Sequence, residues 1–272
     1  MRRRARQAGR SRGGALPAVL TIAGSDSGGG AGIQADLKTF MALGVYGASA
    51  ITCVTAQNPD GVAGIAALAP RLVALQIRQV CWGFPIAAAK TGMLYSAAII
   101  RAVARTVEEL KIPNLVVDPV MVATSGARLL QPEAVRALRA ALLPLARLIT
   151  PNLPEAEALL DRRIATREEA AAAAAELSRE FGTACVVKGG HLAGREVWDV
   201  LADGRRLWVF KTPRVAARET HGTGCTFSAA AAALLARGRT LADAVQGAQR
   251  VVGAALRRAA RVGRHYPLRV GG

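Results

Sequence analysis

The stretch from Thr220 to Thr226 (THGTGCT) combines residue types that can bind an anion and accept a proton. Gly222 and Gly224 have no Cβ, so backbone N–H groups can approach a ligand closely. An Ala-rich segment that should be helical follows, and a helix N-terminus favours an anion. The thiol of Cys225 is expected to have a lowered pKa there. The pattern predicts an anion hole beside a candidate base, although a Gly-rich turn around a small buried cysteine would look the same.

A second glycine-rich stretch lies near the start of the chain. The run from Ala18 to Ala23 is typical of a buried strand, and five glycines follow within residues 24–32. Apolar residues at helical spacing then extend from Ile33 to Leu43. This order predicts a strand, a loop and a helix, with backbone that a small ligand can approach. The glycine spacing matches neither a dinucleotide fingerprint nor a Walker A loop.

Polar residues follow several apolar runs that are expected to be strands. Gln57 comes after the run Ala48–Thr55, in a predicted turn, and Asp118 ends the run Leu115–Asp118. Asn152 follows Leu148–Thr150, and Lys188 ends Ala184–Lys188. In open parallel sheets ligands bind beyond the carboxyl ends of the strands. We therefore expect these four side chains to gather at one edge of the sheet.

Alternating strands and helices predict an α/β fold whose central sheet is mostly parallel, with helices on both faces. Asn152 and Glu155 have the spacing of a capping box that opens a helix, as do Thr166 and Glu169. Later, the runs 197–201 and 207–211 flank a turn and predict an antiparallel hairpin at one edge of the sheet. Residues 16–272 are expected to form a single domain.

The charge of the chain is strongly positive but unevenly placed. The net charge is +17, from 36 Lys and Arg against 19 Asp and Glu, and residues 1–12 and 244–272 each hold six Arg without an acid. We expect solvated tails, with residues 1–15 as a disordered extension, and no nucleic-acid partner. The alternative is a nucleic-acid-binding protein that uses both basic ends. Four scattered cysteines favour the reducing cytoplasm, and no segment is apolar enough for a membrane span.

Taken in order, seven motifs make the chain resemble a known family. They are GSDSGGGAGIQAD from Gly24 to Asp36, Gln57-Asn58, KTGML from Lys90, DPVM from Asp118, TPNLPE from Thr150, KGGH from Lys188 and HGTGCT from His221. The set, spread over residues 18–265, is similar to the hydroxymethylpyrimidine/phosphomethylpyrimidine kinases of thiamine biosynthesis, in the ribokinase superfamily. Glu219 departs from the neutral polar residue expected there, which can change the charge near the phosphates.

The resemblance implies two successive phosphorylations by ATP at one site, with Mg²⁺ held through the ATP phosphates and water. It places Gly24, Asp36 and Gln57 beside the pyrimidine and Lys188 at a phosphate. Cys225 takes the place of the aspartate base of sugar kinases. The other residues that it implies are the anion hole (Gly222, Thr223, Gly224) and the Mg²⁺ and water network (Asn152, Glu155, Asp118). We also expect a homodimer.

Simpler roles remain open for several of these residues. Asn152 and Glu155 could form only a helix cap, and Lys188 could be a solvated strand end. Asp36 could be a solvated helix residue, and Gln57 a turn residue that bonds nearby backbone. Among activities, the nearest rival is a pyridoxal kinase of the same superfamily, and a kinase of a thiazole alcohol is more distant.

Overall fold

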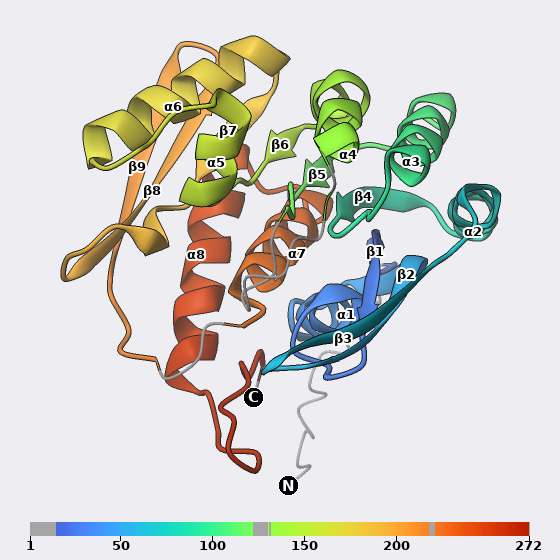
Figure 1. Ribbon diagram of the computed structural model, residues 1–272, viewed down its shortest axis with the longest axis horizontal. Coiled ribbons are helices and arrows are strands. Elements are labelled where there is room, and N and C mark those ends of the chain that lie inside the picture. Colours follow the sequence, from blue (N-terminus) through green and yellow to red (C-terminus); the bar gives the residue numbers. More distant parts are fainter. Residues whose placement is uncertain (1–14, 122–129, 131, 218–220, 272) are drawn as a thin grey trace, which may run out of the picture.

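The computed structural model describes residues 15–121, 130, 132–217 and 221–271, which form one nine-stranded sheet between two layers of helices (Figure 1). The strand order is β3-β2-β1-β4-β5-β6-β7-β8-β9. The strands are β1 (Ala18–Asp26), β2 (Tyr46–Asn58), β3 (Gly61–Ala67), β4 (Ile86–Thr91), β5 (Leu115–Val117), β6 (Leu148–Ile149), β7 (Ala184–Val187), β8 (Glu196–Asp203) and β9 (Arg206–Pro213).

The six strands from β2 to β7 in this order are parallel, which confirms the predicted sheet. The predicted hairpin is β8–β9, antiparallel at one edge. The sequence prediction missed β3, which pairs antiparallel with β2 at the other edge. Because β3 consists of glycine, alanine and only two β-branched residues, it has low strand propensity. Its pairing with β2 stabilises it as a strand instead.

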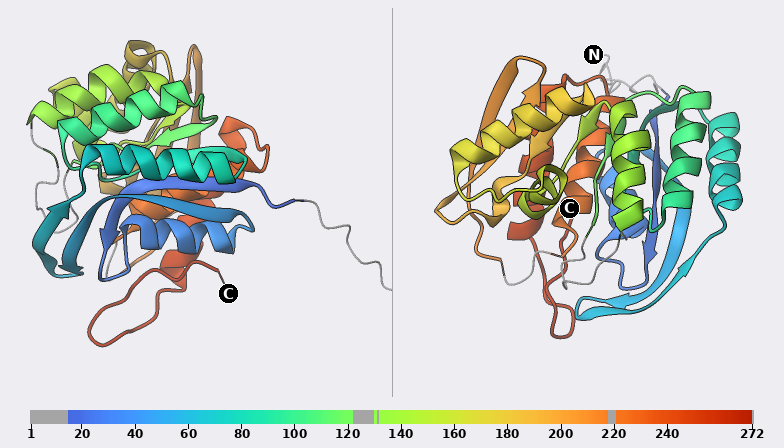
Figure 2. Two further views of the ribbon diagram at one scale, coloured as in Figure 1. Left: turned by 90° about the vertical axis from the view of Figure 1, so that its right-hand side faces the viewer. Right: turned by 45° about the horizontal axis from the view of Figure 1, so that its top comes forward.

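Helices cover both faces of the sheet, as Figure 2 shows. The helices are α1 (Gly32–Ala42), α2 (Pro70–Gly83), α3 (Ala97–Glu109), α4 (Pro132–Ala137), α5 (Leu153–Leu160), α6 (Arg167–Phe181), α7 (Thr223–Ala236) and α8 (Leu241–Arg257). A π turn (Leu138–Leu142) and a 3-10 turn (Leu143–Leu145) continue α4, and a 3-10 turn (Gly189–His191) follows β7. The apolar side chains of α2 to α6 pack on one face, and those of α1, α7 and α8 on the other.

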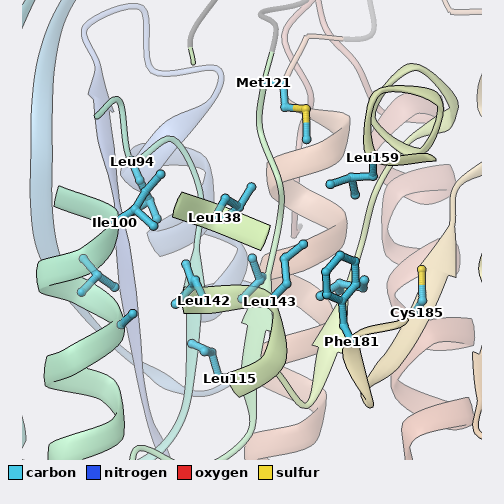
Figure 3. Packing of buried hydrophobic residues seen from close by; sticks show 14 of the residues in the cluster. Leu94, Ile100, Leu115, Met121, Leu138, Leu142, Leu143, Leu159, Phe181 and Cys185 are labelled. Carbon is cyan, nitrogen blue, oxygen red and sulfur yellow. The ribbon is translucent and has the colours of Figure 1, made fainter. Parts of the chain in front are cut away.

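The alternation of side chains along each strand divides the core into two halves. Val19 of β1 points to the α1 and α7 face, where it joins Phe40, and Leu20 and Ile22 point to the α2 and α3 face. Figure 3 shows part of the core on the face covered by α2 to α6, where leucines of the turns after α4 lie near Leu115 of β5. The sheet is therefore buried on both faces, which holds its strand ends in fixed positions beneath the loops.

Local sequence signals set the helix starts. The side chains of Ser96 and Thr240 accept hydrogen bonds from the first turns of α3 and α8. Both predicted capping boxes are present, at Asn152 with Glu155 and at Thr166 with Glu169. These bonds satisfy backbone donors that the helix itself leaves without a partner.

The six arginines of the basic C-terminal region are exposed, as we expected, but the region is not a tail throughout. Much of it is α8, whose Ala244, Val245 and Ala248 are fully buried against the sheet. Beyond α8, Arg264 forms an ion pair with Asp60 in the turn between β2 and β3. Residues 1–14, with most of the predicted N-terminal extension, lie outside the described residues. Within the described ranges no helix is long and apolar enough to cross a membrane.

Candidate active site

Two glycine-rich loops meet at the carboxyl ends of β1 and β4. One follows β1 (residues 26–32) and the other precedes α7 at His221 and Gly222. Gly222 has φ +83°, and a Cβ on it would overlap the carbonyl oxygen of Gly30. The loops thus touch backbone to backbone, which requires glycine at position 222. Thr220 and Glu219 lie outside the described residues.

Asp26 fastens these loops to each other. Its carboxylate accepts hydrogen bonds from the N–H groups of Gly28, Gly30 and Ala31 at 2.7–3.0 Å. His221 Nε2 lies 3.2 Å from the same carboxylate. Burial by itself raises the pKa of Asp26, but the bonds from His221, Ala31 and Gly28 outweigh it and lower the pKa below its ordinary value. Asp26 is thus a charged anchor of the site.

Helix α7 starts at Thr223, four residues earlier than the sequence indicates, with Gly222 as its N-cap. The N–H of Thr226 makes the first intrahelical bond, to Gly222 O at 2.9 Å. The N–H groups of Gly224 and Cys225 precede this bond and point out of the helix end, where they favour an anion. This arrangement supports the predicted anion hole, which stays a prediction.

Cys225 lies in the first turn of α7, where its half-buried thiol accepts a hydrogen bond from the N–H of Gly32. The expectation of a lowered thiol pKa was wrong. Burial raises the pKa of Cys225 to about 11, and the opposing effects of Lys90 and of the Gly32 N–H are smaller. The thiol is therefore protonated at neutral pH in the ligand-free protein.

A compact group of charges lies over Gly224. Lys188 Nζ is 3.2 Å from Asp118 Oδ1, and both side chains are largely buried. Asp118 also accepts hydrogen bonds from Thr150 at 3.2 Å and Ser228 at 3.0 Å. A Cβ on Gly224 would lie 3.5 Å from Lys188 Nζ and 3.7 Å from Asp118 Oδ2. Lys188 is thus held at the helix end, and is not a solvated strand end.

Glu155 and Asn152 lie beside this ion pair. They form the capping box of α5, so the simpler of their two roles is confirmed. Glu155 is only 6% exposed. Burial raises the pKa of Glu155 to about 7, against the opposing effect of Lys188. A carboxylate whose charge is so poorly compensated is a good partner for a further cation.

Gln57 lies in the β2–β3 hairpin and is half-exposed. Its backbone exchanges two hydrogen bonds with the hydroxyl of Ser27, at 2.7 and 2.8 Å. Its side-chain Oε1 accepts a bond from Thr55 at 3.2 Å. Strand β2 thus runs through the residues predicted as a turn, and Ser27 ties Gln57 to the loop after β1.

The structure places Asp36 differently from the sequence interpretation. Its carboxylate is fully buried, bonded to Lys90 Nζ at 2.9 Å through both oxygens and to Thr21 at 2.6 Å. It lies behind the loops and is neither solvated nor open to a ligand. Gly24 packs against Cys53, whose Sγ would be 2.8 Å from an added Cβ. Gly24 therefore serves close packing of the loop.

A pocket of about 170 Å³ opens beside Lys188, which forms part of its lining. It lies between β8, β9, α7 and α8. Its lining includes the predicted residues Asn152, Lys188, Thr223 and Gly224. Residues that the sequence analysis did not single out also line it, among them Val197, Thr212, Phe227, Gln249, Val252 and Leu256. These are single side chains on regular elements, so no local motif could have found them.

Asp199, in the wall of this pocket, accepts a hydrogen bond from the N–H of Gly189 at 2.9 Å. Burial raises its pKa to about 6. The bond holds the turn after Lys188 against β8. Among the described residues, no group of three or more His, Cys, Asp or Glu side chains is arranged to hold a metal ion.

The mostly parallel sheet, the helix start at Gly222 and the adjoining apolar pocket are the architecture of a ribokinase-like small-molecule kinase. The Phosphomethylpyrimidine kinase family matches residues 26–269, and the chain belongs to this family. It is therefore a phosphotransferase.

Curated relatives agree with this assignment. The chain is 49% identical over 245 residues to the hydroxymethylpyrimidine/phosphomethylpyrimidine kinase of Rhizobium meliloti, with 90% of this chain and 92% of that protein covered. For the Escherichia coli enzyme of the same name the identity is 47% over 242 residues, covering 89% and 91%. It is 48% identical over 251 residues to the thiamine biosynthesis bifunctional protein ThiED of Geobacter sulfurreducens, covering 92% of this chain but only 51% of that protein.

Solved structures show the same fold. The ADP complex of Bacillus subtilis pyridoxal kinase superposes with a TM-score of 0.87 at 37% identity, covering 94% of this chain and 98% of that one. Phosphomethylpyrimidine kinase from Clostridium difficile 630 superposes with a TM-score of 0.78 at 40% identity, covering 87% and 98%. The fold is thus common to a pyridoxal kinase and a phosphomethylpyrimidine kinase.

Proposed function

We propose that the protein phosphorylates 4-amino-5-hydroxymethyl-2-methylpyrimidine with ATP, and then phosphorylates the monophosphate to the diphosphate used in thiamine biosynthesis. The observation that carries this proposal is the position of the anion hole. On one side, Gly224 lines the apolar pocket beside α8. On the other side, Gly222 contacts the loop after β1, and Ser27 of that loop is hydrogen-bonded to Gln57. Two ligands placed on its two sides would bring a phosphoryl group and a hydroxyl group together.

The pocket fits the nucleotide. Val197, Phe227, Val252 and Leu256 offer apolar walls for a flat base, as is usual in ligand pockets. Lys188 lines the same pocket beside Gly224, where its ammonium would meet the phosphates. Asp118 keeps Lys188 charged and fixed, because an ion pair with a buried carboxylate raises the pKa of the lysine.

The same cluster fits Mg²⁺ bound through phosphate and water. Glu155 and Asp118 are buried carboxylates near one cation, Lys188, and burial raises the pKa of Glu155 to about 7, so a further cation would stabilise its charged form. Glu155 and Asn152 would hold water molecules around the ion. When bound, Mg²⁺ neutralises charge on the transferred phosphoryl group.

Cys225 is the proposed base. The hydroxyl oxygen of the pyrimidine bonds to the γ-phosphorus, the bond from phosphorus to ADP breaks, and the hydroxyl proton passes to the Cys225 thiolate. Because phosphoryl transfer has a loose transition state, positioning and charge neutralisation carry most of the catalysis. A thiol that is rarely ionised can therefore serve.

Product analysis tests this function. We expect mass spectrometry to show the monophosphate and then the diphosphate when the protein is incubated with ATP, Mg²⁺ and the pyrimidine alcohol. Monophosphate alone after exhaustive incubation would contradict the second step. Phosphorylation of pyridoxal but not of the pyrimidine would establish the rival activity. A homodimer and a cytoplasmic location remain predictions.

Gln57 provides a test of the substrate class. Its carboxamide can donate a hydrogen bond to a ring nitrogen of an aminopyrimidine and accept one from the amino group, as Asn and Gln do with adenine. The substitution Gln57→Met keeps a similar volume but removes both bonds. We expect a loss of about 1–3 kcal/mol, or roughly 5- to 150-fold in kcat/KM for the pyrimidine. Steady-state kinetics measure this loss.

Pyridoxal and a second glutamine provide the controls. Pyridoxal lacks the amino–imine edge, so any activity toward it should fall less. Gln246→Met makes the same chemical change on α8, where the residue is half-buried, and should leave both activities unchanged. Equal losses on both substrates, or none on the pyrimidine, would remove Gln57 from the substrate site.

A further inference from the structure

An ion pair is buried directly behind the anion hole. Lys90 Nζ lies 2.9 Å from each oxygen of the Asp36 carboxylate, and both side chains are fully buried. Thr21 of β1 donates a further hydrogen bond to Asp36 at 2.6 Å. A Cβ on Gly92 would lie only 2.8 Å from Lys90 Nζ, so glycine there leaves room for the ammonium. The pair joins the end of β4 to the second turn of α1.

A buried ion pair of this kind seldom stabilises a fold more than apolar residues would. Taking two charges out of water costs several kcal/mol for each ion, and apolar residues of similar volume are often as stabilising. Lys90 is the second-last residue of β4, at the end of the strand from which the site loops extend, and it is in register with Thr21 of β1. Its position therefore suggests a role in the chemistry of those loops.

The thiol of Cys225 is the reactive group beside this pair. Helix α1 starts at Gly32, whose N–H bonds the thiol, and Asp36 follows one turn later on the same helix. Three charged groups act on the thiol: Lys90 from β4, Asp36 from α1 and Asp118 from the segment after β5. Helix α7, which carries the thiol, packs against both α1 and β4, so the ion pair lies beneath it. The Lys90 ammonium favours the thiolate, and the two carboxylates oppose it.

We propose that Lys90 is a positioning residue for Cys225: Asp36 holds its buried ammonium in place, and the ammonium stabilises the thiolate that accepts the substrate proton. This role rests on the proposed function of Cys225 as the base. The ammonium remains charged because Asp36, Cys225 and Asp118 together outweigh the effect of burial and raise the pKa of Lys90 well above its ordinary value. Asp36 would thus act on catalysis through Lys90, without touching the substrate.

Alkylation of the ligand-free protein by iodoacetamide tests the proposal without any turnover. The experiment uses a Cys81→Ala background, because Cys81 is the other cysteine that is not fully buried. We expect Lys90→Met to slow the alkylation of Cys225 at about pH 8 by roughly threefold to tenfold, because fewer thiolates form. Peptide mass spectrometry identifies the modified cysteine, and rates at several pH values follow its ionisation.

Two further variants separate charge from structure. Lys90→Met together with Asp36→Leu removes both charges without leaving a buried carboxylate unpaired, and so protects the test if the single variant unfolds. It should slow alkylation by a similar factor. Thr21→Val loosens the same cluster without changing its charge, and alkylation should stay within about twofold of the parent rate.

The outcomes are distinct. Unchanged or faster alkylation in the double variant would overturn the proposal, since a purely structural pair would expose the thiol when removed. Slowing in the single variant alone would trace the effect to the orphaned Asp36 and would also overturn it. If Cys225→Ala kept full activity, the base assignment would fail, and the alkylation rates would still report how Lys90 acts on the thiol.

Discussion

The substitution Cys225→Ala is expected to lower kcat by roughly 10²–10⁴-fold, which is the usual share of a general base. The thiol lies at the start of α7, beside the N–H groups that would hold the transferred phosphoryl group. Alanine keeps the helix and those N–H groups but cannot accept a proton. The KM values for ATP and the pyrimidine should change little, because the thiol is expected to contribute mainly to the chemical step.

The pH dependence of kcat/KM provides a second test of Cys225 as the base. Because the pKa of Cys225 is raised to about 11, the thiolate fraction grows with each unit of pH below that value. The kcat/KM of the parent protein should therefore rise between about pH 7 and 9, whereas the residual activity of Cys225→Ala should lack this rise. Cys81→Ala, which lies on α2, should behave as the parent. A variant with near-normal kcat would show that Cys225 only fills space.

The substitution Gly222→Ala is expected to lower the free energy of unfolding by at least about 3 kcal/mol and to abolish most activity. Two costs add at this position. The residue has φ +83°, which L side chains rarely adopt, and a Cβ would overlap the carbonyl oxygen of Gly30. The loops would have to separate, and the anion hole would lose its shape. Urea unfolding and steady-state kinetics measure the two effects.

Gly238→Ala is the matched control. Gly238 follows α7 at φ +74°, and nothing lies within 4 Å of the site of its missing Cβ. Only the conformational cost, about 1 kcal/mol, should appear there, with normal kcat. If Gly222→Ala cost no more than Gly238→Ala, the close contact between the two loops would be disproved.

Much of the site was predictable because it is built from short-range signals. The capping box at Asn152 and Glu155, the glycines around Cys225 and the polar residue after each strand are all readable from neighbours in the chain. Parallel strands then bring such residues to one edge of the sheet. For this reason Lys188 and Asp118, 70 residues apart, meet as expected.

Two predictions failed for reasons that local pattern does not contain. A helix start favours a thiolate, but the depth of burial decides the balance, and here burial raises the pKa of Cys225. The resemblance places Asp36 beside the pyrimidine, and the alternative was a solvated helix residue, but Lys90, 54 residues away, occupies both of its oxygens. Burial and partners are set by packing between elements, so no window of sequence reports them.

The sequence alone determined the parallel α/β sheet, its late hairpin and most helix starts, because periodicity, capping and glycine placement act within a few residues. Only the tertiary structure decided the edge strand β3, the apolar pocket under α8, the contact of Gly222 with Gly30 and the ion pair behind Cys225. Each of these needs surfaces from elements far apart in the chain. Their energies arise from burial and close contact, which exist only once the sheet and its two helical layers have come together.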